Sequence, residues 1–267
     1  MANMRVLFRC DPALIDLLPR PRPAREALPD WLRRMPASAF SESHGHSVRT
    51  VKQCPPFVDA MTHGFVMTLP CDVEVAKGEF RWDWPLPPLS VQGHTRSPLS
   101  FHAPAQALGS PFHDERRAIL KFNSFWTIEL EEGWSLLATH PFNRPDLPFR
   151  TLTGLVDSDR FHDVGIFFPA VWMQADFSGL LPAGTPVVQC IPVSREAIAL
   201  ECLPFTQAEA ARYAGVGAAI KAEAGYYRKK ARAPKRSGSE ALAERLEIED
   251  EDADTAGRER LADGGEG

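Results

Sequence analysis

The sequence predicts a mainly β fold: an antiparallel β-sandwich or a barrel-like arrangement (jelly-roll or β-clip-like), with short helices and a C-terminal helix. Of the 24 prolines, 23 lie before Phe205, and proline breaks helix interiors because it lacks a backbone donor. Short apolar segments recur between Gly, Pro and Asp residues, a spacing typical of antiparallel sandwiches and barrels. The 16 Phe and 6 Trp, against only 3 Tyr, would fill the core of such a fold.

The first third of the chain predicts short strands and two short helices. Pro55 and Pro56 suit the start of the second helix, and Gly64 suits its C-terminal cap. After the turn at 77–78, alternation places Phe80, Trp82 and Trp84 on one face of a strand. The expected strands are 4–9, 48–53, 65–70, 72–76 and 80–84, and the first helix is 28–35.

Residues 85–117 are rich in Pro, Ser, Gly and His and show little periodicity. A segment of this length in a compact domain is often functional or mobile. After it the strand pattern strengthens, and each apolar run is bounded by Gly, Pro or Asp. The expected strands are 118–122, 125–130, 134–140, 151–157, 165–173, 184–193 and 197–203.

Charge and composition predict three regions: a single β-rich domain at 1–205, a C-terminal helix at 206–234 and a disordered acidic tail at 235–267. The formal net charge is -5. Residues 237–267 hold 11 acidic and 3 basic residues, so this stretch carries -8 and residues 1–236 carry +3. The tail has almost no large apolar residue to bury, which is typical of solvated, disordered segments.

Several classes of protein lose support. No apolar run is long enough to span a membrane, and the N-terminus lacks the features of a signal peptide. Five scattered cysteines form no CxxC pair, which favours reduced thiols and a cytoplasmic location. Phosphate-loop, dinucleotide-binding, nucleophile-elbow and zincin motifs are absent, and no basic stripe with interleaved aromatics predicts a nucleic-acid partner.

The histidines are the main candidate reagents for metal chemistry. His44 and His46 form an HxH pair, which on a strand would share a face, although their segment resembles a loop. His113 and Glu115 form an HxE pair that a distant histidine could complete as a facial triad for iron. The metal-ligating candidates, for a divalent cation, are His102, His140 and His162.

Two polar clusters also invite a functional interpretation. Asp157, Asp159 and His162 follow a strand closely and could bind a cation or supply a general base. Turn chemistry explains the same Asp-Ser-Asp pattern, because Asp and Ser hydrogen-bond to their own backbone in tight turns. Arg144 could pair with Asp146 or Asp157 for a structural or a catalytic purpose.

A series of motifs resembles a family of unknown function found in bacteria and tailed bacteriophages. The motifs are TVKQCPPFVDAMTHGFVMTLPCDV (50–73), FHAPAQ (101–106), KFNSFWTIELEEGWSLLATHPFNR (121–144), TLTGLVDSD (151–159), FFPAVW (167–172) and FSGLLPAGTPVVQCIPVSRE (177–196). The resemblance covers about residues 50–205 and implies a compact, mostly β domain without an established activity. It also implies a set of polar binding residues that could converge in one pocket: His102, Gln106, Asn143, Arg144, Asp157, Asp159 and Gln189.

The same region is weakly similar to the β-clip architecture of deoxyuridine triphosphatase-like proteins. This likeness depends on a Gly-hydrophobic-Val-Asp strand followed by GTPVVQCIPV. The nucleotide motifs of those enzymes are absent, so no site residue is carried over from them.

Two functional hypotheses follow. The first is a non-catalytic binding or assembly module, with a protein partner or a small molecule, and with a homo-oligomer as one form of assembly. The second is a small-molecule enzyme that uses His and Asp residues of the β domain, with non-haem iron or another divalent cation as its cofactor.

Overall fold

A computed structural model describes residues 4–114, 119–223 and 225–233. Every strand pairing in it is antiparallel. The chain forms two compact units. The first, the β unit, runs to Leu32 and again from Phe57 to Glu196, and the second comprises Arg33–Pro56 and the chain from Ala197 onward.

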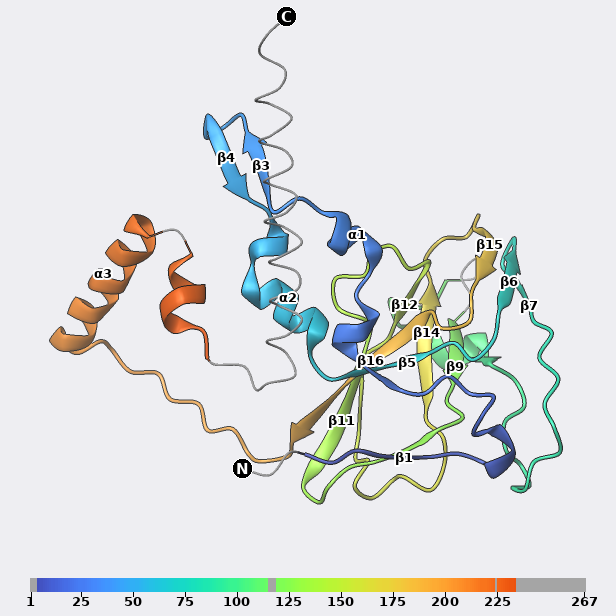
Figure 1. Ribbon diagram of the computed structural model, residues 1–267. Coiled ribbons are helices and arrows are strands. Elements are labelled where there is room, and N and C mark those ends of the chain that lie inside the picture. The colour runs from blue at the N-terminus through green and yellow to red at the C-terminus, as the bar shows by residue number, and fades with distance from the viewer. Residues whose placement is uncertain (1–3, 115–118, 224, 234–267) are drawn as a thin grey trace, which may run out of the picture. The chain divides into compact units, whose positions relative to one another are not determined.

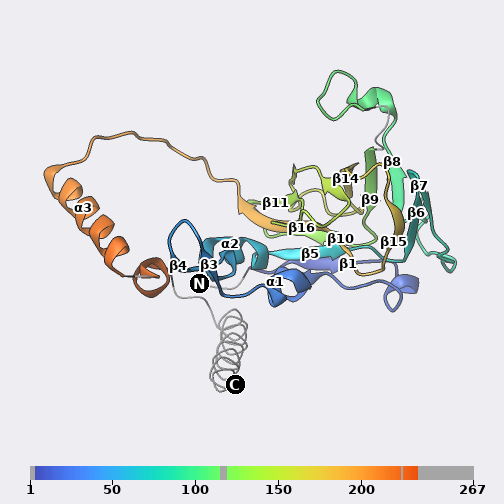
Figure 2. The same ribbon diagram turned by 90° about the horizontal axis from the view of Figure 1, so that it is seen from above.

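Two sheets form the β unit's main layers. The first has the strand order β13-β11-β16-β5-β2, and the second has the order β12-β14-β9-β8. Figure 2 shows β14, β9 and β8 on one side of β16 and β5. The strands of the first sheet are β2 Arg22–Pro23, β5 Phe65–Thr68, β11 Trp134–Thr139, β13 Gly154–Val156 and β16 Pro186–Ser194. Those of the second are β8 Leu99–Phe101, β9 Ile119–Asn123, β12 Phe149–Thr151 and β14 Phe167–Trp172.

Two smaller sheets complete the β unit. One is the β1–β10 ribbon, and the other has the order β15-β6-β7 and lies together at one edge in Figure 1. Their strands are β1 Leu7–Arg9, β10 Thr127–Glu129, β6 Val73–Ala76, β7 Glu79–Arg81 and β15 Ser178–Leu181. The short helices are η1 Pro12–Leu14, η2 Ala24–Ala27, α1 Asp30–Arg34, α2 Pro55–Thr62 and η4 Pro104–Ala107.

One continuous apolar core lies between the two main sheets. The side chains of Phe122, Phe149 and Trp172 are almost fully buried, and the Phe122 and Phe149 ring centroids are 4.7 Å apart. The central strand β16 is buried over five consecutive residues, so both of its faces are covered. Burying a large apolar side chain contributes about 1.5–3 kcal/mol to folding, and this core therefore holds the β unit together.

The second unit contains a hairpin and a solvent-exposed helix. The hairpin pairs β3 Ser38–Ser41 with β4 His46–Arg49 and is followed by η3 Val51–Gln53. The helix α3, Gln207–Ala222, starts with a capping box in which Thr206 and Glu209 bond to each other's backbone N–H groups. No residue of α3 is buried. A short π-helix, η5 Tyr227–Ala231, follows it.

The predicted fold class is confirmed: the protein is mainly β, with antiparallel sheets, short helices and the helix α3 near the C-terminus. The sheets of the described chain are open, so the sandwich and not a closed barrel is formed. The predicted second helix is also confirmed, since α2 begins at Pro55 and Gly64 follows it at a φ of 71°. No helix among the described residues is long and apolar enough to cross a membrane.

The strand expected at 197–203 is wrong. These residues have no regular secondary structure, and Ile198, Leu200 and Leu203 are each more than 80% exposed. Their apolar alternation resembles that of a strand, but no neighbouring strand pairs with them. The domain boundaries expected at 1–205 and 206–234 stay predictions, and the acidic tail at 235–267 lies outside the described residues.

Candidate functional site

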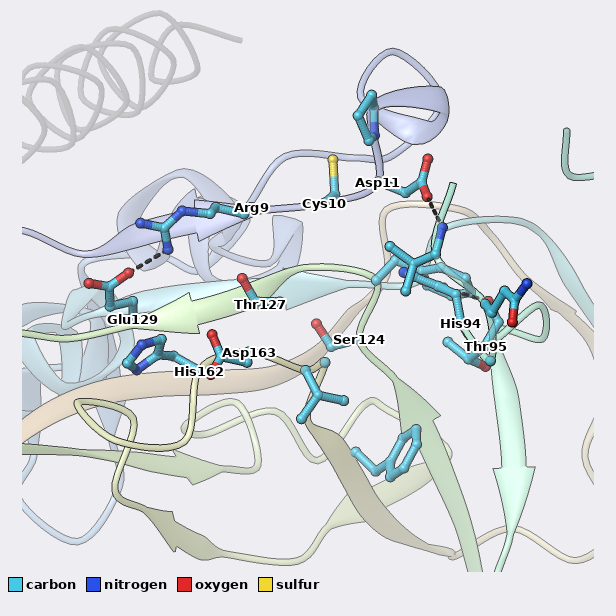
Figure 3. Close-up of a pocket in the computed structure, with 18 residues that line it drawn as sticks. Arg9, Cys10, Asp11, His94, Thr95, Ser124, Thr127, Glu129, His162 and Asp163 are labelled. Atoms are coloured by element: carbon cyan, nitrogen blue, oxygen red, sulfur yellow. Dashed lines mark hydrogen bonds and ion pairs between the residues drawn. The ribbon is translucent and has the colours of Figure 1, made fainter. Parts of the chain in front are cut away.

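The β unit contains a cavity of about 690 Å³ beside the β1–β10 ribbon (Figure 3). Four segments that are distant in sequence form its wall: the end of β1, the loop at 91–95, the start of β10 and the segment at 162–167. Its lining residues are Arg9, Cys10, Asp11, Pro12, Val91, Gln92, Gly93, His94, Thr95, Ser124, Phe125, Thr127, Glu129, His162, Asp163, Val164, Gly165 and Phe167.

Close backbone packing fixes the middle of the cavity wall. Ser124 N–H donates to the Ile166 carbonyl at 3.0 Å, and Ser124 Oγ bonds to both the N–H and the carbonyl of Trp126. A Cβ atom at Gly165 would lie 2.2 Å from the Ser124 carbonyl oxygen. Only glycine at position 165 therefore lets the 162–167 segment approach the backbone of Ser124 so closely.

Asp11 anchors one end of the cavity. Its Oδ1 accepts the Ala13 N–H at 3.0 Å, and its Oδ2 accepts the N–H groups of Ser90 and Val91 at 2.7 and 3.1 Å. These backbone donors, Ala13 first, hold the pKa of Asp11 below its usual value. The carboxylate is thus committed to holding the 90–91 loop against the end of β1, and we assign it a structural role.

His94 lies at the same end and has a defined tautomer when neutral. Its Nδ1 lies 2.8 Å from the Thr95 carbonyl oxygen. A carbonyl can only accept, so Nδ1 carries the proton and donates, and Nε2 of the neutral ring has a free lone pair. The ring stacks on Phe125 with centroids 5.6 Å apart.

The other end of the cavity gathers Arg9, Glu129 and His162 (Figure 3). Arg9 Nη1 donates to the Glu129 carboxylate, across the paired strands β1 and β10. This hydrogen bond holds the pKa of Glu129 below its usual value, and the charges of Arg9 and His162 act in the same direction. The ion pair leaves this end close to electrically neutral.

Two buried polar atoms in the wall have no hydrogen-bond partner among the described residues. They are Thr127 Oγ1 and His162 Nδ1. Buried polar atoms in proteins are nearly always paired. Thr127 Oγ1 and His162 Nδ1 are exceptions to this rule, and each has almost no surface that solvent can reach.

Arg195 brings together two of the predicted site residues, Asp157 and Asp159. The sequence analysis did not single out Arg195 itself. The Arg195 guanidinium binds Asp159 through Nη1 and Nη2, and Asp159 Oδ2 also accepts the Gly133 N–H at 3.0 Å. Asp157 Oδ1 accepts the Ser135 hydroxyl at 2.6 Å and lies 3.5 Å from Arg195. This network joins β11, β16 and the turn after β13.

The pH dependence of stability tests this network. Arg195 holds the pKa of Asp159 well below its usual value, so the ion pair stabilises the fold above the unfolded-state pKa of about 4. Its contribution is lost as the pH falls from there toward the folded-state pKa. We expect Asp159→Asn to lower the urea midpoint at pH 6.5 and to differ much less from the wild type at pH 2.5. The exposed control Asp176→Asn should match the wild type at both, and a pH-independent Asp159→Asn difference would contradict the assignment.

A second group of predicted residues surrounds the end of α2. Gln189 is 2% exposed and bonds to the backbone of Phe142, Ala60 and His63. Asn143, which has a φ of 56°, lies within 3.5 Å of the Phe57 carbonyl. These contacts are internal to the fold.

His140 and Arg144 belong to the same region. His140 Nε2 donates to the Arg144 carbonyl at 3.0 Å, and its Nδ1 accepts the Thr151 N–H at 3.2 Å. Burial lowers its pKa, which favours the neutral ring that these bonds require. Arg144 makes a bidentate ion pair with Asp146, at 2.8–3.1 Å, and not with Asp157.

His102 and Gln106 form a third group at η4, where His102 Nδ1 lies 3.2 Å from Gln106 Oε1. The seven polar residues implied by the resemblance thus fall into separate groups, and none of them lines the cavity. Of the metal candidates, His102 is at η4, His140 is held inside the fold and His162 lines the cavity. Among the described residues, no three His, Cys, Asp or Glu side chains form a metal-binding group, and Glu115 lies outside them.

Part of the cavity could be predicted from the sequence. Residues 91–95 belong to the unpatterned segment at 85–117, which suggested a functional or mobile region, and His162 was one of the metal candidates. Arg9, Asp11 and Glu129 carried no signal, because Arg9 and Glu129 are 120 residues apart and Asp11 is 79 residues from Ser90.

Together these features define a β-sandwich protein with a cavity of ligand size at a strand-ribbon edge. Comparison with protein-family models and with curated proteins gives no match. Among solved structures, a mutant dUTPase from phage phi11 of S. aureus is similar at 11% identity and a TM-score of 0.32, over 76% of this chain and 99% of that chain.

Proposed function

We propose that the protein is a binding module that takes a small organic molecule into the cavity beside β1 and β10. The observation that carries the proposal is the cavity itself: its volume of about 690 Å³ falls within the range of about 300–1,000 Å³ typical of small-molecule sites. Apolar side chains, including Val91, Phe125 and Val164, line it together with a few polar groups. This combination of apolar wall and sparse polar groups supports uptake of a ligand.

An enzyme acting on the same molecule is the second candidate. The observation that favours it is the pair of imidazoles, His94 and His162, in the cavity lining. Neutral His94 has a free Nε2 lone pair, which is what a general base needs. A metal-dependent version would need a bound ion. The described residues contain no group of three His, Cys, Asp or Glu side chains that could hold one.

Two further statements remain proposals. We propose membership in the family of unknown function that the motifs at 50–196 resemble. We also propose a cytoplasmic location, which is supported by five cysteines that are all free thiols.

Ligand-observed NMR with the full-length chain tests the binding function. A library of small aromatic and aliphatic fragments should give binders that compete with one another for one site. Val164→Trp, which places an indole in the cavity wall, should weaken them at least about tenfold, equivalent to about 1.4 kcal/mol. Leu155→Trp, on the exposed face of β13, is the matched control and should bind them normally.

The loop at 91–95 supplies a second filling variant, Val91→Trp. If every fragment binds both filling variants as well as it binds the wild type, the cavity is not the site and the proposal is wrong. Thermal unfolding of each variant distinguishes loss of binding from loss of folding.

A further inference from the structure

We infer that the cavity selects a protonated amine carried on an apolar or aromatic body. This inference rests on the proposed binding function and specifies its ligand. Three properties of the lining support it: the balance of charge, the hydrogen-bonding polarity and the aromatic surface.

The charge balance of the lining is negative. The described part of the chain contributes three carboxylates to it, those of Asp11, Glu129 and Asp163, and one guanidinium, that of Arg9. Asp11 is satisfied by backbone N–H groups, and Glu129 is paired with Arg9. Asp163 makes no hydrogen bond or ion pair with the residues that the structure describes, so its carboxylate can pair with a cationic ligand.

An anionic ligand would meet the opposite situation. Among the described residues, Arg9 is the only guanidinium or ammonium group in the lining, and Glu129 already neutralises it. A ligand carboxylate at Arg9 would compete with Glu129 for the guanidinium and would add negative charge to a lining that holds two further acidic side chains. Like charges in a partly enclosed site repel more strongly than in water.

Two side chains of the lining have acceptor atoms that a ligand can use. Neutral His94 offers Nε2, because its Nδ1 proton is used on Thr95, and Asp163 offers two carboxylate oxygens. An ammonium group carries three N–H donors and no acceptor, so it matches this set, whereas a carboxylate or ketone does not.

Aromatic rings complete the match. Phe125 and Phe167 line the cavity. His94 stacks on one face of Phe125 and Lys121 Nζ lies 5.2 Å from the centroid of Phe167, so a ligand would use the remaining surface of each ring. The ring faces of Phe and Tyr attract ammonium groups through their quadrupole, by about 0.5–1 kcal/mol at exposed sites. The same rings would pack against an aromatic or aliphatic ligand body.

Three probes of one shape test the selectivity: 3-phenylpropylamine, 3-phenylpropan-1-ol and 3-phenylpropanoate. Their affinities are measured by NMR titration of the full-length protein at pH 7.5. The amine is expected to bind at least about tenfold more tightly than the alcohol, and the carboxylate to bind most weakly. Asp163→Asn should reduce amine affinity to the level of the alcohol and leave alcohol affinity unchanged. Asp176→Asn, which changes an exposed carboxylate outside the cavity, is the matched control and should alter neither.

Other results overturn the inference in distinguishable ways. If the carboxylate binds as tightly as the amine, or if Asp163→Asn preserves the preference for the amine, the assigned ligand chemistry is wrong. If the amine fails to bind while other fragments bind the wild type and not Val164→Trp, the amine inference falls and the binding function stands. If no fragment depends on the cavity, both fall together.

Discussion

Replacing Gln189 by leucine is expected to lower the free energy of unfolding by about 3–5 kcal/mol, since each buried polar group left unpaired costs about 1–3 kcal/mol. The Gln189 side chain is 2% exposed. Its Oε1 accepts the Phe142 N–H at 3.0 Å, and its Nε2 donates to the carbonyls of Ala60 and His63 at 2.9 and 2.6 Å. Leucine fills a similar volume but leaves three backbone groups without this partner.

Guanidinium unfolding, followed by intrinsic tryptophan fluorescence, measures the effect. Gln174→Leu is the matched control, because Gln174 is exposed and its side chain makes no hydrogen bond or ion pair with the described residues. Its effect should stay within about 0.5 kcal/mol, as for most surface substitutions. A Gln189→Leu protein as stable as the wild type would show that the three bonds contribute little.

The result also bears on what the family resemblance implied for Gln189. A glutamine that recurs in a motif can bind a ligand or hold the fold together, and the sequence does not distinguish these roles. In the structure, its amide ties the end of α2 to β16 and to the loop after β11. A large loss of stability would explain the residue by the fold alone.

Local sequence patterns were sufficient to predict many of the helices and strands. They failed where pairing with another strand decides whether a segment becomes a strand. The start of α2 follows from Pro55 and its end from Gly64, because proline favours the first helical turn and glycine the left-handed cap. The 197–203 segment has strand-like alternation but no neighbouring strand. Conversely β15 pairs with β6 although only Leu181 among its residues is buried, so alternation gave no signal of it.

The site was less predictable than the fold, for a physical reason. Its polar contacts join residues far apart in sequence: Arg9 with Glu129, and Asp11 with the N–H groups of Ser90 and Val91. The cluster Asp157-Ser158-Asp159 is visible in the sequence. The cation that pairs with it, Arg195, is distant in the chain and directly follows the end of β16. Spacing along the chain reports neighbours on one element, whereas a cavity depends on which elements pack together.

The junction that Gln189 stabilises also supplies the second large expected effect. Gly64→Ala should lower the free energy of unfolding by about 3–5 kcal/mol, the sum of left-handed backbone strain and forced displacement of a packed strand. Gly64 has a φ of 71°, and a Cβ atom there would lie 2.1 Å from the Cys190 carbonyl oxygen. That carbonyl is part of β16 backbone, which cannot rotate away as a flexible side chain could.

Gly184→Ala separates the two causes. Gly184 has a φ of 84°, but nothing lies within 4 Å of the position its Cβ would take. It therefore carries the backbone strain alone, and we expect a loss of about 1–2 kcal/mol. Chemical denaturation of both variants gives the difference, which is the cost of the steric contact with β16. If both lose the same stability, the close approach of Gly64 to Cys190 is relieved by a small shift, and strain at the cap is the whole effect.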